Sequence, residues 1–190
     1  MLDREEAWSL LCEYTKSDSL RRHALGVETA MRAMADKYGG DPDLWGITGL
    51  LHDFDYEMYP TAEEHPFKGV EILRGKGYPE EMLEAIMGHA EYTGVAREST
   101  LAKALFAVDE LVGFIFAVTY VRPSKSVLEV KPKSVKKKLK QKSFAASVNR
   151  DDITMGMEEL NLEPTEHFQF VIDALSKNAD TLGLAGVADA

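Results

Sequence analysis

Apolar residues recur at intervals of three and four along most of the chain, and this spacing predicts α-helices that each bury one face. Capping residues, prolines in first turns and glycines after last turns mark the expected helix ends. The first part of the chain is therefore predicted to form helices at about residues 3–14, from the Ser17/Asp18 cap to Gly39, from Asp41-Pro42 to His52-Asp53, at about 62–73, from Pro79 to Ala90, and at about 100–121.

Arg122-Pro123 breaks this pattern, and helices are expected to resume after a short turn. The expected elements are a turn at 124–130, a basic helix from Pro132 to about Gln141, a helix at about 153–160 after a capping loop at 149–152, an amphipathic helix from Pro164, and a small-residue tail at about 182–190. No segment alternates with period two for long enough to predict a strand. The fold class is therefore all-α. A chain of 190 residues with 45% hydrophobic content predicts one domain over residues 1–190.

Composition narrows the expected cellular setting. The first residues are acidic and lack the basic, then apolar, run of a secretory signal, so we expect a cytoplasmic protein. The longest apolar run, Leu111–Val121, is shorter than the roughly 18 residues that suggest a membrane span, so no membrane insertion is expected. Cys12 is the single cysteine, which excludes an internal disulfide, and its helical spacing with Trp8 predicts a position in the core.

Histidines and aspartates interrupt several of the apolar helical faces. They are His23, the pair His52 and Asp53, His65, His89 and Asp109. A lone histidine on such a face is more often a hydrogen-bonded core residue than a ligand, but a buried aspartate is costly without a cation or several donors. Because these positions fall on five successive predicted helices, we predict a metal site in the core. His167, in the first turn of the last predicted helix, is expected at the surface.

This ordered set resembles the HD superfamily of metal-dependent phosphohydrolases, in which a histidine, a His-Asp pair and a distal aspartate bind metal inside a helical bundle. The resemblance is carried by Arg22-His23-Ala24-Leu25-Gly26-Val27, Gly49-Leu50-Leu51-His52-Asp53 and Ala107-Val108-Asp109-Glu110-Leu111. It covers about residues 18–121. It implies an HD-domain helical bundle with a metal-binding core over that range and a helical extension at about 122–190.

The resemblance also implies the ligands and the reaction. One metal would be held by His23, His52, Asp53 and Asp109. HD relatives with two further histidines hold a second metal, and here His65 and His89 would do so, with Asp53 as the bridge. Two cations about 3.5–4 Å apart would activate a hydroxide for attack on phosphorus. The implied protein is a hydrolase of a small phosphate ester, such as a nucleotide. Its cofactor would be one or two divalent ions, with Fe, Mn, Zn, Mg and Ni not distinguished, and homo-oligomer formation is left open.

Two other functions fit the same ligand series. HD-type oxygenases such as those resembling inositol oxygenase use two irons, which would be redox-active. A non-catalytic module would use the metal only to join helices, and its ligand set would be closed.

The sequence departs from the commonest HD pattern directly after the His-Asp pair. Many HD hydrolases continue Ile-Gly-Lys, whereas this chain has Phe54, Asp55 and Tyr56, so a cation is lost and an acid is gained. Asp53 and Asp55 are the candidate catalytic residues. Asp55 would either orient a metal-bound water or a histidine, or cap the helix end and face solvent.

Charge is unevenly spread along a chain whose formal net charge is −10. The basic segment, residues 121–142, carries nine Lys or Arg and one Glu, so it is +8 and the rest of the chain is −18. The acidic remainder argues against nucleic-acid binding. Either the basic segment pairs with the acidic body, or one face of its helix lies over the metal site. In the second case Val135 and Leu139 would face inward, and Lys136 and Lys138 would bind substrate phosphate.

Overall fold

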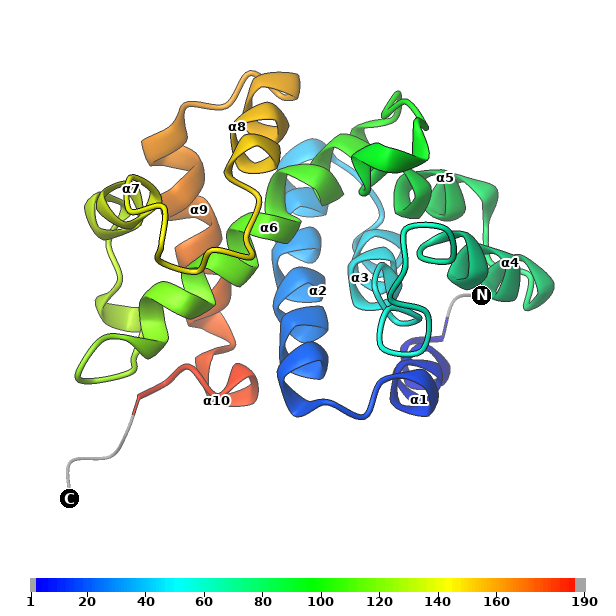
Figure 1. Ribbon diagram of the computed structural model, residues 1–190, viewed down its shortest axis with the longest axis horizontal. Helices are drawn as coiled ribbons and strands as arrows, with labels where there is room; N and C mark the ends of the chain where they lie inside the picture. The colour runs from blue at the N-terminus through cyan, green and yellow to red at the C-terminus, as the bar shows by residue number, and fades with distance from the viewer. Residues whose placement is uncertain (1–2, 187–190) are drawn as a thin grey trace. The chain divides into compact units, whose positions relative to one another are not determined.

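The computed structural model describes residues 3–186, and the regular elements of this range are helices (Figure 1). The predicted all-α fold class is confirmed. The chain divides into two compact units, Met1–Phe106 and Ala107–Ala190, and the single domain expected over residues 1–190 stays a prediction. Within residues 3–186, no helix is both long enough and apolar enough to cross a membrane.

The first unit is built from helices whose ends follow the capping residues. Its elements are α1 (Arg4–Tyr14), α2 (Asp18–Tyr38), α3 (Pro42–Leu51), α4 (Phe67–Gly75), α5 (Glu80–Gly88), the 3₁₀ turn η1 (Glu91–Thr93) and the start of α6 (Thr100–Tyr120). The side chains of Asp3, Ser17 and Asp41 accept hydrogen bonds from backbone N–H groups in the first turns of α1, α2 and α3. Gly39 follows the end of α2, and its φ of 72° lies in the left-handed region that favours glycine.

α2 and α3 lie side by side in this unit (Figure 1). Gly49 permits their close approach, because a Cβ at this position would lie 2.9 Å from the carbonyl oxygen of Val27. The contact places His23 of α2 beside His52 at the end of α3. The buried apolar core next to it includes Leu11, Leu51, Phe54, Leu73 and Leu83.

Glu28 is a buried carboxylate of α2 that binds one arginine of α1 and one of its own helix. Arg4 of α1 donates to it through Nε and Nη2, each at 2.9 Å, and Arg32 of α2 donates through Nε at 3.2 Å and Nη2 at 3.1 Å. Arg32 also donates to Asp43 of α3 at 2.9 Å. Because a buried charge is costly unless it is paired, these two arginines make the position of Glu28 tolerable and tie α1, α2 and α3 together.

One predicted boundary in the first unit is wrong. The fourth helix was expected from about residue 62, whereas α4 begins at Phe67. The preceding residues form turns, in which the His65 N–H donates to the carbonyl oxygen of Thr61. Pro66 explains the late start, since proline disfavours helical geometry in the residue before it. His65 therefore lies in the turn before α4 and not on a helix face.

The second unit continues α6 and adds shorter helices. They are η2 (Val127–Glu129), α7 (Pro132–Leu139), α8 (Arg150–Glu159), α9 (Pro164–Lys177) and α10 (Ala179–Leu182). α8 begins three residues earlier than predicted, because the Asn149 side chain accepts hydrogen bonds from the first N–H groups of the helix. α10 was not predicted, because four residues are too few to show a helical period. In the small-residue tail, the Leu184 carbonyl accepts from the Val127 N–H at 2.8 Å, and residues 187–190 lie outside the described range.

His167 is buried, so its expected surface position is wrong. His167 is 1% exposed, its ring stacks on Phe170, and its Nε2 lies 2.8 Å from the carbonyl oxygen of Ala107. Val171 and Ala174 follow it by four and seven residues and are also buried. His167 therefore belongs to the inward stripe of α9, a spacing that the sequence already contained.

Candidate metal centre

Asp53, His65 and His89 converge from three segments of the first unit. Asp53 lies in the turn after α3, His65 lies in the turn before α4, and His89 caps the C-terminal end of α5. The Nε2 atoms of His65 and His89 each lie 3.1 Å from Asp53 Oδ1 and 3.4 Å from each other. Three of the six predicted ligands thus form one group with the spacing of a metal site.

The outer nitrogen of each histidine around Asp53 is held by an acceptor. His65 Nδ1–H donates to Asp55 Oδ1 at 2.8 Å. His52 and His89 each donate Nδ1–H to the carbonyl oxygen three residues earlier. Because these partners can only accept, they fix the tautomer in which Nε2 keeps its lone pair. Outer hydrogen bonds of this kind are what orients an imidazole toward a metal.

The inner atoms of the cluster are consequently all acceptors. The Nε2 lone pairs of His65 and His89 and the carboxylate of Asp53 face one another at 3.1–3.4 Å, an arrangement that needs a proton or a cation among them. Nitrogen and oxygen ligands in this number fit a divalent transition metal. The Asp53 side chain is 26% exposed, whereas those of His65 and His89 are nearly covered, so Asp53 marks the side open to solvent.

The second oxygen of Asp53 faces a different histidine. Asp53 Oδ2 lies 3.5 Å from His52 Nε2, and the His52 ring lies next to His23, with ring centroids 5.4 Å apart. Asp53 therefore offers Oδ1 to one pair of histidines and Oδ2 to another imidazole. This is the arrangement that a carboxylate bridging two metals requires.

These contacts shift the pKa values of Asp53 and His65. Burial raises the pKa of Asp53, but the nearby His52 and the hydrogen bonds of His65 and His89 outweigh it and hold the pKa well below its usual range. Burial lowers the pKa of His65, but its hydrogen bonds and charge attraction to Asp53 and Asp55 outweigh it and raise the pKa to about 9. A proton on His65 thus takes the place of a cation, and a metal has to displace it.

Asp55 is fully buried and holds His65 in place. Its Oδ1 accepts the His65 Nδ1–H, and its Oδ2 accepts the Gly69 N–H in the first turn of α4 at 2.8 Å. A Cβ on Gly69 would lie 2.6 Å from Asp55 Cγ, so only glycine fits. Of the two alternatives for Asp55, the geometry matches the residue that orients a histidine and not the cap that faces solvent.

Two tyrosines flank His65. The Tyr56 ring meets the His65 ring edge to face, with centroids 5.3 Å apart, and the Tyr92 hydroxyl donates to the His65 carbonyl oxygen at 2.9 Å. Burial, and then the charges of Asp53 and Asp55, raise the pKa of Tyr92 to about 12, so its hydroxyl stays a donor at neutral pH. The sequence gives no sign of Tyr92, because a contact between residues 27 positions apart has no periodic signature.

The remaining predicted site residues belong to different units, and each is described within its own unit. His23 is half-buried on α2 of the first unit. Asp109 is half-buried on α6 in the second unit, where α7 also carries the exposed Lys136 and the half-buried Lys138. That Asp109 joins the ligands, and that these lysines reach the substrate, stay predictions.

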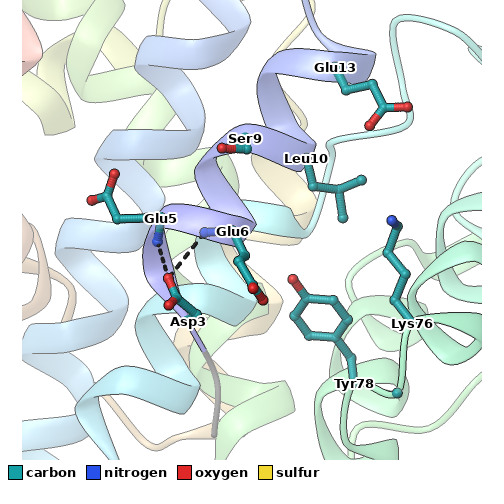
Figure 2. Close-up of a pocket in the computed structure, with 9 residues that line it drawn as sticks. Asp3, Glu5, Glu6, Ser9, Leu10, Glu13, Lys76 and Tyr78 are labelled. Atoms are coloured by element: carbon teal, nitrogen blue, oxygen red, sulfur yellow. Dashed lines mark hydrogen bonds between the residues drawn. The ribbon is translucent and has the colours of Figure 1, made fainter.

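A pocket of about 630 Å³ in the first unit is lined by α1, its N-cap Asp3 and the turn after α4, and four of its nine residues are acids (Figure 2). Asp3 Oδ1 accepts the N–H groups of Glu5 and Glu6, and Lys76 and Tyr78 lie across from this helix. Burial, and then Glu6 and Asp3, raise the pKa of Tyr78. The groups of metal-ligand type found in the described residues do not include these acids. Asp3, Glu5 and Glu6 lie at the N-terminus of α1, where negative charge is favourable.

The helices and the His/Asp cluster define an all-α protein with a donor set suited to a divalent metal. Residues 20–112 match the HD domain family, a range that includes all six predicted ligands. This match confirms the HD resemblance seen in the sequence over residues 20–112, and HD domains are commonly metal-dependent hydrolases. No curated protein and no solved structure matches the chain.

Proposed function

We propose that this protein is a metal-dependent phosphohydrolase that acts on a small phosphate ester, with nucleotides among the candidate substrates. The observation that carries the proposal is the convergence of Asp53, His65 and His89, in which each histidine is oriented by an acceptor on its outer nitrogen. The partial exposure of Asp53 also supports a site that a substrate can approach, in contrast to a closed structural site.

The proposed ligand set extends this cluster. His65 and His89 hold one divalent ion with Asp53, and His23, His52 and Asp109 hold a second ion with the other oxygen of Asp53. Two observations support this set: the family match spans these residues, and Asp53 directs its two oxygens to different histidines. A donor set this rich in imidazole favours Fe, Mn, Zn or Ni over Mg, which prefers oxygen ligands and water.

A bound divalent ion would lower the pKa of a coordinated water toward neutrality and offset negative charge on a phosphoryl oxygen. The chain's own residues would hold the ligands in register. Asp53 is the proposed catalytic carboxylate, and Asp55 is a positioning residue that keeps His65 Nε2 directed at the metal. Tyr56 places a phenol where many relatives have a lysine, so it can donate a hydrogen bond but adds no positive charge.

Metal stoichiometry tests the shared role of Asp53. Asp53→Ala should lose metal from both positions, whereas His89→Ala should keep the metal held by His23, His52 and Asp109. Elemental analysis of protein purified without chelator gives the number of ions per chain. If wild-type and His89→Ala proteins contain the same number of ions, the two-metal assignment is wrong.

Substrate screening tests the reaction. The metal-loaded protein is assayed with phosphomonoesters, phosphodiesters and nucleoside polyphosphates, and Asp53→Ala serves as the inactive control. Release of phosphate by the wild type alone supports the proposal. Oxygen consumption by iron-loaded protein without phosphate release would instead identify an oxygenase. Metal that exchanges no water and supports no turnover would identify a structural site.

Lys136 and Lys138 remain the proposed cations for substrate phosphate. Replacing both with Gln should raise KM for a phosphorylated substrate, leave the metal content unchanged, and have less effect at high salt. Unchanged kinetics together with a lower melting temperature would show that these lysines only balance the acidic body.

A further inference from the structure

A concave pocket of about 390 Å³ lies in the second unit, where the end of α6 meets α7. It is lined by Val118, Val121, Arg122, Pro123, Ser134, Lys137, Lys138 and Gln141. Its volume lies within the range of small-molecule sites. All of these residues belong to one compact unit, so the pocket does not depend on how the two units are placed.

The polar part of the lining is cationic and contains no carboxylate. Arg122, Lys137 and Lys138 supply three positive charges, and Ser134 and Gln141 are neutral. Arg122 Nη2 is 3.3 Å from Glu129, outside the lining. The Nε of Arg122 is buried and, within residues 3–186, donates to no acceptor. The guanidinium is therefore only partly compensated by Glu129, and an anion that contacts it from the pocket would add a charge-assisted hydrogen bond.

The lysines of α7 are not neutralised within their unit. Lys133 and Lys137 are four residues apart on α7, and Lys136 is four residues from the C-cap Lys140, so like charges crowd this helix and destabilise it. Among the described residues of the second unit, no salt bridge joins a lysine of the basic segment to a carboxylate. The expected pairing with acidic residues is therefore not found inside this unit. An anionic ligand would offset the repulsion among these lysines.

The pocket also has an apolar wall and an oriented cation. Val118, Val121 and Pro123 line it without polar side chains. Lys138 Nζ lies 4.5 Å above the Phe144 ring and 3.2 Å from Gln141 Oε1, and both contacts restrict the position of its charge. An ordered cation beside an apolar wall is suited to a ligand that is anionic at one end and apolar at the other.

We propose that this pocket binds the phosphate group of a small, partly apolar phosphorylated molecule. Arg122, Lys137 and Lys138 contact the phosphate, and the wall formed by Val118 and Val121 contacts the apolar part. Its concave shape and apolar wall distinguish this pocket from a flat polyanion surface, which would present lysines alone. This inference does not rest on the reaction proposed for the metal centre. Lys138 is common to both proposals, whereas Lys136 does not line the pocket.

Calorimetry on the full chain tests the pocket with two probes, inorganic phosphate and phenyl phosphate. To remove binding at the metal centre, the measurement is made on chelator-treated protein and on Asp53→Ala, each checked for helix content by circular dichroism. One saturable site is expected in both, with phenyl phosphate bound more tightly. The double variant Lys137→Gln/Lys138→Gln should weaken binding about tenfold. Val121→Asp, which puts a carboxylate on the wall, should weaken it at least as much.

The matched control is Lys131→Gln/Lys133→Gln, which removes the same charge from the same segment outside the pocket. It should change affinity less than about twofold. Equal weakening by the two double variants, or a short DNA duplex that binds more tightly than phenyl phosphate, would show a general polyanion surface and overturn the proposal. Loss of phosphate binding in Asp53→Ala with its helix content intact would place the anion at the metal centre and also overturn it.

A separate measurement shows whether the molecule bound in the pocket is the hydrolysed substrate or another phosphorylated metabolite. If the bound molecule is the hydrolysed substrate, Lys137→Gln/Lys138→Gln raises its KM and leaves kcat unchanged. If KM stays unchanged while phenyl phosphate binding falls tenfold, the pocket takes a different phosphorylated metabolite.

Discussion

The Gly69 N–H donates to the Asp55 carboxylate, which lies so close that no side chain fits at position 69. The methyl group of Gly69→Ala should push the Asp55 carboxylate away from His65 and release the imidazole that Asp55 orients. Loss of such an outer hydrogen bond lowers metal affinity by about 10–100-fold. Metal titration of the variant should show this loss.

Gly75 provides the control, because it lies in the same helix and a Cβ there would meet no atom within 4 Å. Gly75→Ala should bind metal as the wild type does and should be slightly more stable, since alanine is the better helix former. Wild-type metal affinity in Gly69→Ala would mean that Asp55 does not orient His65.

Single residues were predictable from sequence where their chemistry is conspicuous. His65 and His89 were predicted as ligands, and the structure brings both to Asp53, although His65 lies in a turn and not on the helix face that the apolar pattern predicted. Gly69 and Tyr92 could not be recognised, because each acts through one contact with a residue distant along the chain. For Asp55, orienting a histidine and facing solvent could not be separated until its burial was known.

At the scale of the helices, Glu28 of α2 is the buried charge that holds Arg4 of α1 and Arg32, which in turn binds Asp43 of α3. Glu28→Ala would leave Arg4 and Arg32 without their shared acceptor, and both arginines are about a third exposed, so water recovers part of the loss. We expect urea denaturation to show a loss of about 2 kcal/mol, less than for a fully buried pair. Glu5→Ala removes the exposed partner of Arg4 and should change stability by less than about 0.5 kcal/mol. If Glu5→Ala lost as much stability as Glu28→Ala, the burial of Glu28 would not be the cause of the effect.

Helix positions followed from the sequence where caps and periodicity agree, as they do for α2 and α3. The start of α4 was not predicted correctly, because Pro66 outweighs the apolar pattern around it. Burial of Glu28 was also missed. Its partner Arg32 lies at i+4, which is a readable signal, but the decisive second arginine comes from another helix.

At the scale of the molecule, stability should depend on pH in opposite ways with and without metal. The pKa of His65 is about 9 in the metal-free fold and about 6.5 when unfolded. Because the folded value is higher, the ion pairs of His65 stabilise the fold fully below about pH 6.5 and are lost as pH rises through 9. The melting temperature of chelator-treated protein should therefore fall between pH 6.5 and 9.

Metal-loaded protein should behave differently, because protons compete with the metal for His65 Nε2. The rise in melting temperature on adding metal should be small near pH 6 and larger near pH 8. Thermal denaturation with and without chelator at both pH values provides the comparison. A metal-induced rise that does not change with pH would show that no proton is displaced from His65.

The basic segment makes the net charge of −10 a poor guide to how the molecule meets a charged surface. The segment is +8 and the remaining chain is −18, and a surface responds to the charge that faces it. In chromatographic terms, the protein should be retained at low salt by an anion exchanger through its acidic part and by a sulfonate resin through its lysines. Opposite charges on neighbouring copies should also attract in dilute buffer, so that moderate salt, which screens this attraction, raises solubility.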